Sequence, residues 1–237
     1  MIVDHSNRRV LDVLQSRDKD AVAQYLRQHK EGGLLAEVEE VTTDMWDGYV
    51  SAAEEVFGEG LRVTIDRFHV MKNFQEQLTQ ARREIQRGLD REAAQQLKGT
   101  RWLWLKNAEH LTASERARLH ELKERFPLLK ELAEQREALR ALFEDRTIAT
   151  AAEGQKRLQE WMAGARQLGL KGLERFCATL TNWLAKVANY FVSRCSNGRT
   201  EGFNHGLRTL LWRAFGMSNF QHFRLRVLDR FGCPHRA

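Results

Sequence analysis

Proline and cysteine are scarce in this chain, and their scarcity limits what it can be. Two prolines, Pro127 and Pro234, interrupt 237 residues, so long helices are permitted over most of the sequence. The three cysteines are odd in number and too widely spaced for a CxxC metal site, which indicates reduced thiols and no disulfide framework. The sequence also lacks a glycine-rich phosphate loop, an internal repeat and a low-complexity tract.

Long apolar runs are missing as well. No segment approaches the length of a membrane span, and the N-terminus lacks the basic-then-apolar pattern of a signal peptide. Because 42% of the residues are hydrophobic, the chain can still bury a core in one or two domains. We therefore expect a globular protein that is not in the membrane and is located in the cytoplasm.

Acidic residues are rare from Arg194 to the C-terminus. This segment holds eight arginines and no lysine, against only Glu201 and Asp229, whereas residues 1–193 hold equal numbers of basic and acidic side chains. The whole net charge of +6 therefore comes from the last segment. Such a concentration predicts a polyanionic partner, and arginine suits bidentate contacts to phosphate. A solvated basic surface with ordinary ion pairs is the alternative.

The first 66 residues alternate between strand and helix patterns. They predict the order strand, strand, helix, strand, helix, strand, with a hairpin turn at residues 5–7. The expected strands lie at residues 2–3, 10–14, 37–42 and 61–65, and the expected helices at residues 21–26 and 49–57.

From Val70 to about Phe191 the pattern is helical. Thr112 and Glu115 form a capping box that opens one helix, and Pro127 suits the first turn of the next. Further helical stretches cover residues 132–143 and run from about residue 158 to 191. The aromatic-rich residues 102–105 are expected to lie in the core.

Two aspartates end predicted strands. Asp44 follows the third strand and Asp66 the fourth. Functional groups gather beyond the carboxyl ends of strands in an α/β sheet, so these carboxylates can converge. Each aspartate also precedes a helical pattern, so a helix N-cap is the alternative. His69, three residues after Asp66, could join such a site or be an ordinary packed or capping histidine.

The segment 196–213 places one acid on a basic helix, which Asn197 or Thr200 could cap. A carboxylate ringed by amide, imidazole and guanidinium groups is equipped to hold a divalent metal against a phosphate backbone. A solvated polar helix face is the alternative. The residues that share this face are Glu201, Asn204, His205, Arg208 and Trp212.

Four segments of this chain resemble the bacterial insertion-sequence transposases of the ISL-three family. They are residues 44–49, 66–70, 100–107 with 111–112, and 196–204, and the resemblance covers essentially the whole chain. It implies an α/β fold with an RNase H-like mixed sheet and a large all-helical insertion before the last acid. It also implies a DDE triad that cuts and joins DNA with Mg²⁺ or Mn²⁺.

The resemblance assigns roles to particular residues. Glu201 takes the place of the final glutamate, and Asp44 ranks first as the middle aspartate, so these two are the expected metal ligands. Asp66 and His69 are expected as neighbouring catalytic-site residues that orient metal, water or DNA. Two acids that serve the same ion pair should have carboxyl groups within roughly 4 to 8 Å of each other.

The expected partner is DNA, both the element ends and the target. We expect three parts: a partial RNase H-like core at residues 1–69, a helical insertion at residues 70–193, and C-terminal helices at residues 194–237. The side chains expected to contact DNA are Arg199, Asn204, Arg208, Arg213, Arg224 and Arg226.

One departure from the family is expected to matter. The family's first aspartate lies on strand one, whereas Met1 stands inside what resembles strand two. The chain therefore resembles an N-terminally truncated transposase with an incomplete sheet, expected to be inactive alone. Competing interpretations are a non-catalytic DNA-binding remnant, which could pair with full-length subunits or with itself, and a helical interaction module without DNA affinity.

Overall fold

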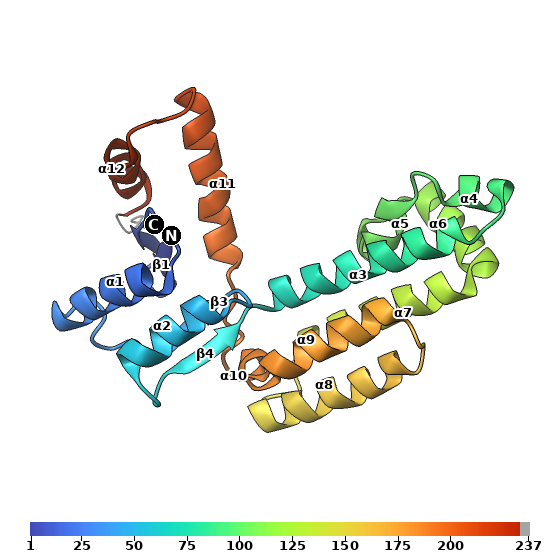
Figure 1. The fold of residues 1–237 in the computed structure, drawn as a ribbon, viewed down its shortest axis with the longest axis horizontal. Helices are drawn as coiled ribbons and strands as arrows, with labels where there is room; N and C mark the ends of the chain where they lie inside the picture. Colours follow the sequence, from blue (N-terminus) through green and yellow to red (C-terminus); the bar gives the residue numbers. More distant parts are fainter. Residues whose placement is uncertain (233–237) are drawn as a thin grey trace. The chain divides into compact units, whose positions relative to one another are not determined.

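The computed structural model describes residues 1–232, so Cys233, Pro234 and Arg236 lie outside the described residues. The chain divides into two units, which we describe separately (Figure 1). The first unit combines residues 1–68 with residues 195–237, and the second comprises residues 69–194.

The first unit mixes short strands with helices. Its order is two strands, a helix, a strand, a helix and a strand, followed after the second unit by two more helices, so the predicted order is present. The elements are β1 (Ile2–Asp4), β2 (Arg9–Asp12), α1 (Lys19–Glu31), β3 (Glu40–Thr43), α2 (Asp47–Phe57), β4 (Arg62–Ile65), α11 (Gly198–Arg213) and α12 (Phe220–Phe231).

The strands of the first unit form two separate sheets. β1 and β2 pair antiparallel as a hairpin, and β3 and β4 pair parallel, connected through α2. A single mixed sheet was expected, but within residues 1–232 no strand pairing joins the hairpin to β3 and β4. The strands are only three or four residues long, so each pair depends on the helices packed against it.

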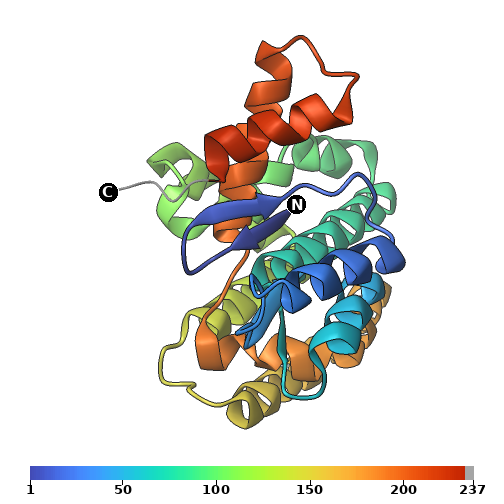
Figure 2. The same ribbon diagram turned by 90° about the vertical axis from the view of Figure 1, so that its left-hand side faces the viewer.

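Helices cover both sheets of the first unit. α1 and α2 pack together around Tyr25, Leu26 and Ala52, with Val41 of β3 against this cluster. The hairpin lies beside the two C-terminal helices (Figure 2). These elements share a second cluster, whose buried members are Val10, Val13, Leu207 and Val227.

The crossing of α11 and α12 is tight at Gly206. A Cβ atom at this position would lie 2.7 Å from the ring of Phe231, closer than atoms can approach without a shift. Glycine therefore lets the two helices pack at this point.

The second unit is entirely helical within the residues that the structure describes. The capping box of Thr112 and Glu115 is confirmed at the start of α6, and Pro127 opens α7. The elements are α3 (Arg67–Arg87), which begins at the end of the first unit, α4 (Arg91–Leu97), α5 (Arg101–Leu105), the 3-10 helix η1 (Ala108–His110), α6 (Ala113–Arg125), α7 (Pro127–Glu144), α8 (Ala151–Arg166), α9 (Lys171–Ala188) and α10 (Tyr190–Ser193).

The structure refines one sequence-based expectation for the second unit and corrects another. The helical stretch from residue 158 to 191 is divided, because the chain turns at Gly169, whose φ is 63°, between α8 and α9. Of residues 102–105, Trp104 and Leu105 are buried as expected, but Trp102 is 67% exposed.

Aromatic packing forms the core of the second unit. The rings of Phe74, Trp161 and Phe176 contact one another edge-on, with centroids 5.1 to 5.8 Å apart. Arg194, the last residue of the unit, donates hydrogen bonds to the backbone carbonyls of Phe143, Asp145 and Ile148. Within residues 1–232, none of the helices combines the length and apolarity needed to cross a bilayer.

Candidate active site

Asp44 and Asp66 stand side by side at the carboxyl ends of two parallel strands. The last residues of β3 and β4, Thr43 and Ile65, are partners in the strand register, so the aspartates occupy the next position on each strand. The backbone N–H of Asp66 donates to the carbonyl of Thr43 at 3.0 Å, which continues the pairing one step past the strands. Neighbouring strands lie about 4.8 Å apart, so residues 22 positions apart in sequence become neighbours.

Asp66 is fully buried and accepts a hydrogen bond at the start of α3. Its Oδ1 accepts from the backbone N–H of Phe68 at 3.2 Å, and its exposed fraction is 0%. The N-cap role considered as an alternative for this aspartate is therefore present. His69 lies in the first turn of the same helix and is half-buried.

Asn197 links Asp44 to the helix that carries Glu201. Its side-chain Nδ2 donates to Asp44 Oδ1 at 3.3 Å, and its backbone carbonyl accepts from the N–H of Glu201 at 2.9 Å. Of the two candidate caps, Asn197 stands at the N-cap position of α11, but its side chain makes no capping bond. Asn197 is only 7% exposed, so the first turn of α11 is held at the end of β3.

Glu201 lies in the first turn of α11, on a face that also carries Asn204. The Nδ2 of Asn204 donates to Glu201 Oε1 at 3.4 Å, so the two residues expected to share a face do interact. The structure therefore brings Asp44, Asp66 and the start of α11 into one region of the first unit. The sequence suggests only a capping role for Asn197, because no sequence pattern predicts a contact with a residue 153 positions away.

His5, in the turn between β1 and β2, is a further member of this region that sequence reasoning treated only as a turn residue. Its carbonyl accepts a hydrogen bond from Arg199, and its Nε2 lies 3.3 Å from the hydroxyl of Thr200. Burial and then the positive charge of Arg199 lower the pKa of His5, whereas the carboxylates of Asp4, Asp66 and Glu40 act in the opposite direction. The imidazole is therefore within electrostatic reach of Asp66.

The expected DNA-contacting arginines fall into two groups. Arg208, Arg213 and Arg226 are exposed on α11 and α12. Arg224 instead donates two hydrogen bonds, of 2.5 and 2.7 Å, to the buried carboxylate of Asp12. This pairing raises the pKa of Arg224. Arg199 is exposed but is engaged with the hairpin carbonyl.

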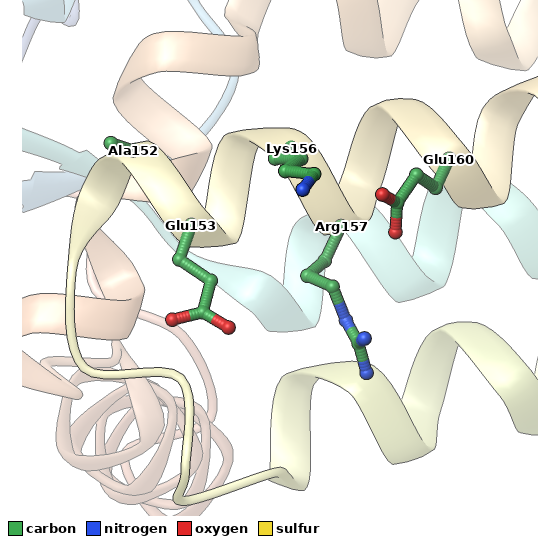
Figure 3. Close-up of a pocket in the computed structure, with 5 residues that line it drawn as sticks. All are labelled: Ala152, Glu153, Lys156, Arg157 and Glu160. Carbon is green, nitrogen blue, oxygen red and sulfur yellow. The ribbon is translucent and has the colours of Figure 1, made fainter.

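The two hollows described in the second unit contain none of the expected site residues. One, of about 420 Å³, runs along α8 between side chains of mixed charge, such as Glu153 and Arg157 (Figure 3). The other, of about 510 Å³, is lined by residues that include Trp102, Lys106 and Arg136.

The family of this chain follows from comparison with known sequences. A model of the ISL3 family of DDE transposases, described as "Transposase", matches residues 1–227. The chain belongs to this transposase family. It is 25% identical to the "Transposase for insertion sequence element IS1001" of Bordetella parapertussis over 239 residues, which cover 98% of the chain and 56% of that protein. The chain thus spans about half the length of this relative. No solved structure matches it.

The side chains of this candidate site have a chemistry that suits a divalent ion. Carboxylate and amide oxygens are the ligands that Mg²⁺ prefers, and Asp44, Asp66 and Glu201 supply the carboxylates. Within residues 1–232, however, no group of three or more His, Cys, Asp or Glu side chains is placed to hold a metal ion.

Proposed function

We propose that this chain is the catalytic-domain part of a transposase that cleaves and joins DNA strands in DNA transposition. The observation that supports it best is the polar connection from Asp44 through Asn197 to the helix carrying Glu201. This connection ties the two expected acids to one region although they are far apart in sequence. The parallel β3–α2–β4 unit beside an antiparallel hairpin supports an RNase H-like fold for this domain.

Each residue of the region has a proposed task. Asp44 and Glu201 hold divalent ions, Mg²⁺ or Mn²⁺, and Asn204 orients the Glu201 carboxylate through their hydrogen bond. Asp66 fixes the start of α3 and, with His69, orients the groups around the ions. When bound, two such ions would activate the attacking oxygen and stabilise the leaving oxygen.

DNA is the proposed partner, both the element ends and the target. Arg208, Arg213 and Arg226 are exposed on the two C-terminal helices, where their guanidinium groups can contact phosphates. We leave Arg224 out of this set because its guanidinium is already engaged by Asp12. Arg199 and Asn204 would lie next to the scissile phosphate, since both are within one turn of Glu201.

We further propose that the chain is nearly inert by itself. Two ions at such a site would be held by several acidic side chains, and the described residues provide no three-ligand group. We infer that a longer polypeptide or another subunit supplies a further carboxylate.

A non-catalytic DNA-binding remnant is the second candidate. It is favoured by the same lack of a three-ligand group combined with the exposed arginines of α11 and α12. Such a protein would occupy DNA, or pair with complete transposase subunits and block them, without using Glu201.

Nicking of supercoiled DNA in Mg²⁺ or Mn²⁺ separates these candidates. The chain should be compared with a polypeptide extended ahead of Met1 by a strand carrying one more aspartate. We expect nicking only by the extended form, and its loss in Glu201→Gln and Asp44→Asn. If neither form nicks while both bind DNA, the remnant is the correct interpretation. If the short form nicks as well as the extended form and Glu201→Ala abolishes both, Asp66 completes the site.

A further inference from the structure

The turn that follows α11 holds an aromatic residue in a conformation that favours glycine. The N–H of Gly216 donates to the carbonyl of Leu211 at 3.0 Å, and the N–H of Phe215 donates to that of Trp212 at 3.1 Å. This pair of bonds is the Schellman motif, whose left-handed residue is usually glycine. Here that residue is Phe215, with a φ of 51°, a strained conformation for a bulky side chain.

Packing does not explain Phe215. Its side chain is 100% exposed, so it buries no apolar surface within the chain that could offset the strain. A glycine would end the helix at lower energy. Strained residues that persist without a structural benefit are concentrated at functional sites. The region around Phe215 is therefore a candidate functional site.

A second exposed aromatic residue stands one turn before it. Trp212 is 80% exposed and lies four residues after the exposed Arg208, so the two share a helix face. Arg213 is exposed beside them. No acidic residue occurs between Glu201 and Asp229, so the segment that carries the two rings has basic side chains and no acidic ones.

We propose that Trp212 and Phe215 form a stacking platform for unpaired bases of a DNA strand whose phosphates contact Arg208 and Arg213. Single-stranded nucleic acid is bound by this combination, in which basic side chains follow the backbone and aromatic rings stack on successive bases. Intact duplex offers phosphates but no accessible base faces, so the exposed rings add nothing to its binding. The positive surroundings favour a polyanion over an apolar protein surface as the occupant.

The position of the platform also predicts the distance along the DNA between the unpaired base and the phosphate at Glu201. This step rests on the function proposed for Glu201. Trp212 lies eleven residues after Glu201 on the same face of α11, which is about 16 Å along the helix. Figure 1 shows the turn between α11 and α12 at the end of α11 away from β3. At about 3.4 Å per nucleotide of a duplex strand, the unpaired base lies about five nucleotides from the phosphate at Glu201.

Binding of the full chain to a labelled oligonucleotide of about 20 nucleotides, as a single strand and as a duplex, tests the platform. Trp212→Ala and Phe215→Gly should each weaken single-strand binding by at least about fivefold, the lower end of the effect of losing one stacked base. Duplex binding should change less than about twofold. Phe215→Gly should keep or raise the thermal midpoint, which separates a binding role from a structural one. Trp102→Ala, which removes another exposed tryptophan, is the matched control and should bind both forms as the parent does.

Other outcomes overturn the inference in distinguishable ways. If both variants bind single strands normally while Arg208→Ala and Arg213→Ala still weaken DNA binding, the platform is wrong and the proposed function stands. If the parent chain binds neither form of DNA, both are wrong. A lower thermal midpoint for Phe215→Gly, or a changed oligomeric state for Trp212→Ala in size-exclusion chromatography, would show that the rings pack against protein.

Discussion

Asn197 donates its side-chain hydrogen bond to Asp44 across 153 positions of sequence. The bond connects the end of β3 to the first turn of α11, and it uses an amide that is almost fully buried. Because the N–H of Glu201 bonds to the carbonyl of the same residue, any displacement of Asn197 also displaces Glu201. The geometry of the candidate site therefore depends on a residue that is not itself an acid.

Asn197→Ala should lower both stability and activity. It removes one buried hydrogen bond, which costs about 1 to 2 kcal/mol of the free energy of unfolding, and it frees the start of α11 from β3. Urea unfolding measures the first effect, and nicking by the extended polypeptide the second. Thr209→Ala, farther along the same helix, is the control and should leave nicking unchanged. Equal nicking by Asn197→Ala and the parent would show that Glu201 is positioned by other contacts.

Arg224→Ala should act on stability and only weakly on DNA binding. Asp12 is 3% exposed, and removing its partner leaves a buried carboxylate, which costs about 3 kcal/mol. Arg226→Ala, at an exposed position two residues later, should have the opposite profile. Urea unfolding and DNA binding of both variants under native conditions provide the comparison. A larger loss of DNA binding in Arg224→Ala than in Arg226→Ala would show that Arg224 does contact DNA phosphates.

The local features of this chain could be predicted from the sequence, whereas the distant pairings could not. Short-range patterns place Asp44 and Asp66 after strands and Glu201 in the first turn of a helix, because strand alternation, capping preferences and helical spacing involve only nearby residues. The partner of Arg224 is Asp12, 212 positions away. No spacing rule separates an arginine that will meet a buried carboxylate from one that will meet solvent or phosphate.

The exposed tryptophan at position 102 shows the same limit within one helix. Trp102 and Trp104 belong to the same short apolar run, yet the first is 67% exposed and the second 2%. Two residues apart on a helix point in different directions, and which side faces the core depends on the neighbouring helices.

His5 should make the first unit less stable in mild acid. Burial and Arg199 lower its pKa in the folded state, so the unfolded chain binds more protons as the pH falls below about 6.5. This contribution to stability is complete above the unfolded pKa and is lost as the pH falls towards the folded pKa. Thermal midpoints between pH 7.5 and 5.5 should decrease for the parent and less for His5→Gln, whose amide can still bond to Thr200. Identical pH profiles would show that His5 is not coupled to folding.

Arg208 and Arg213 should set the salt dependence of DNA binding. Each phosphate contact releases condensed counterions, so replacing both arginines with alanine should reduce the slope of log K against log salt concentration by about 1.8. The measurement is duplex binding between about 50 and 200 mM salt. Double replacement of Arg116 and Arg118 on α6 is the control, and its slope should equal that of the parent. An unchanged slope for the double variant of α11 would place the phosphate contacts elsewhere.

Asp44 and Asp66 should differ in their importance for metal binding, although they are neighbours at the strand ends. Asp66 is fully buried and accepts a hydrogen bond from the start of α3, so its carboxylate has a structural role. Asp44 instead accepts a hydrogen bond from Asn197, which stands at the start of the helix that carries Glu201. Titration of the chain with Mn²⁺ by calorimetry should show weak binding, because no three-ligand group is present in residues 1–232. Asp44→Asn and Glu201→Gln should each abolish this binding, while Asp66→Asn, which keeps an oxygen for the Phe68 N–H, should retain most of it. If Asp66→Asn abolishes the binding and Asp44→Asn does not, the metal ligand at the strand ends is Asp66.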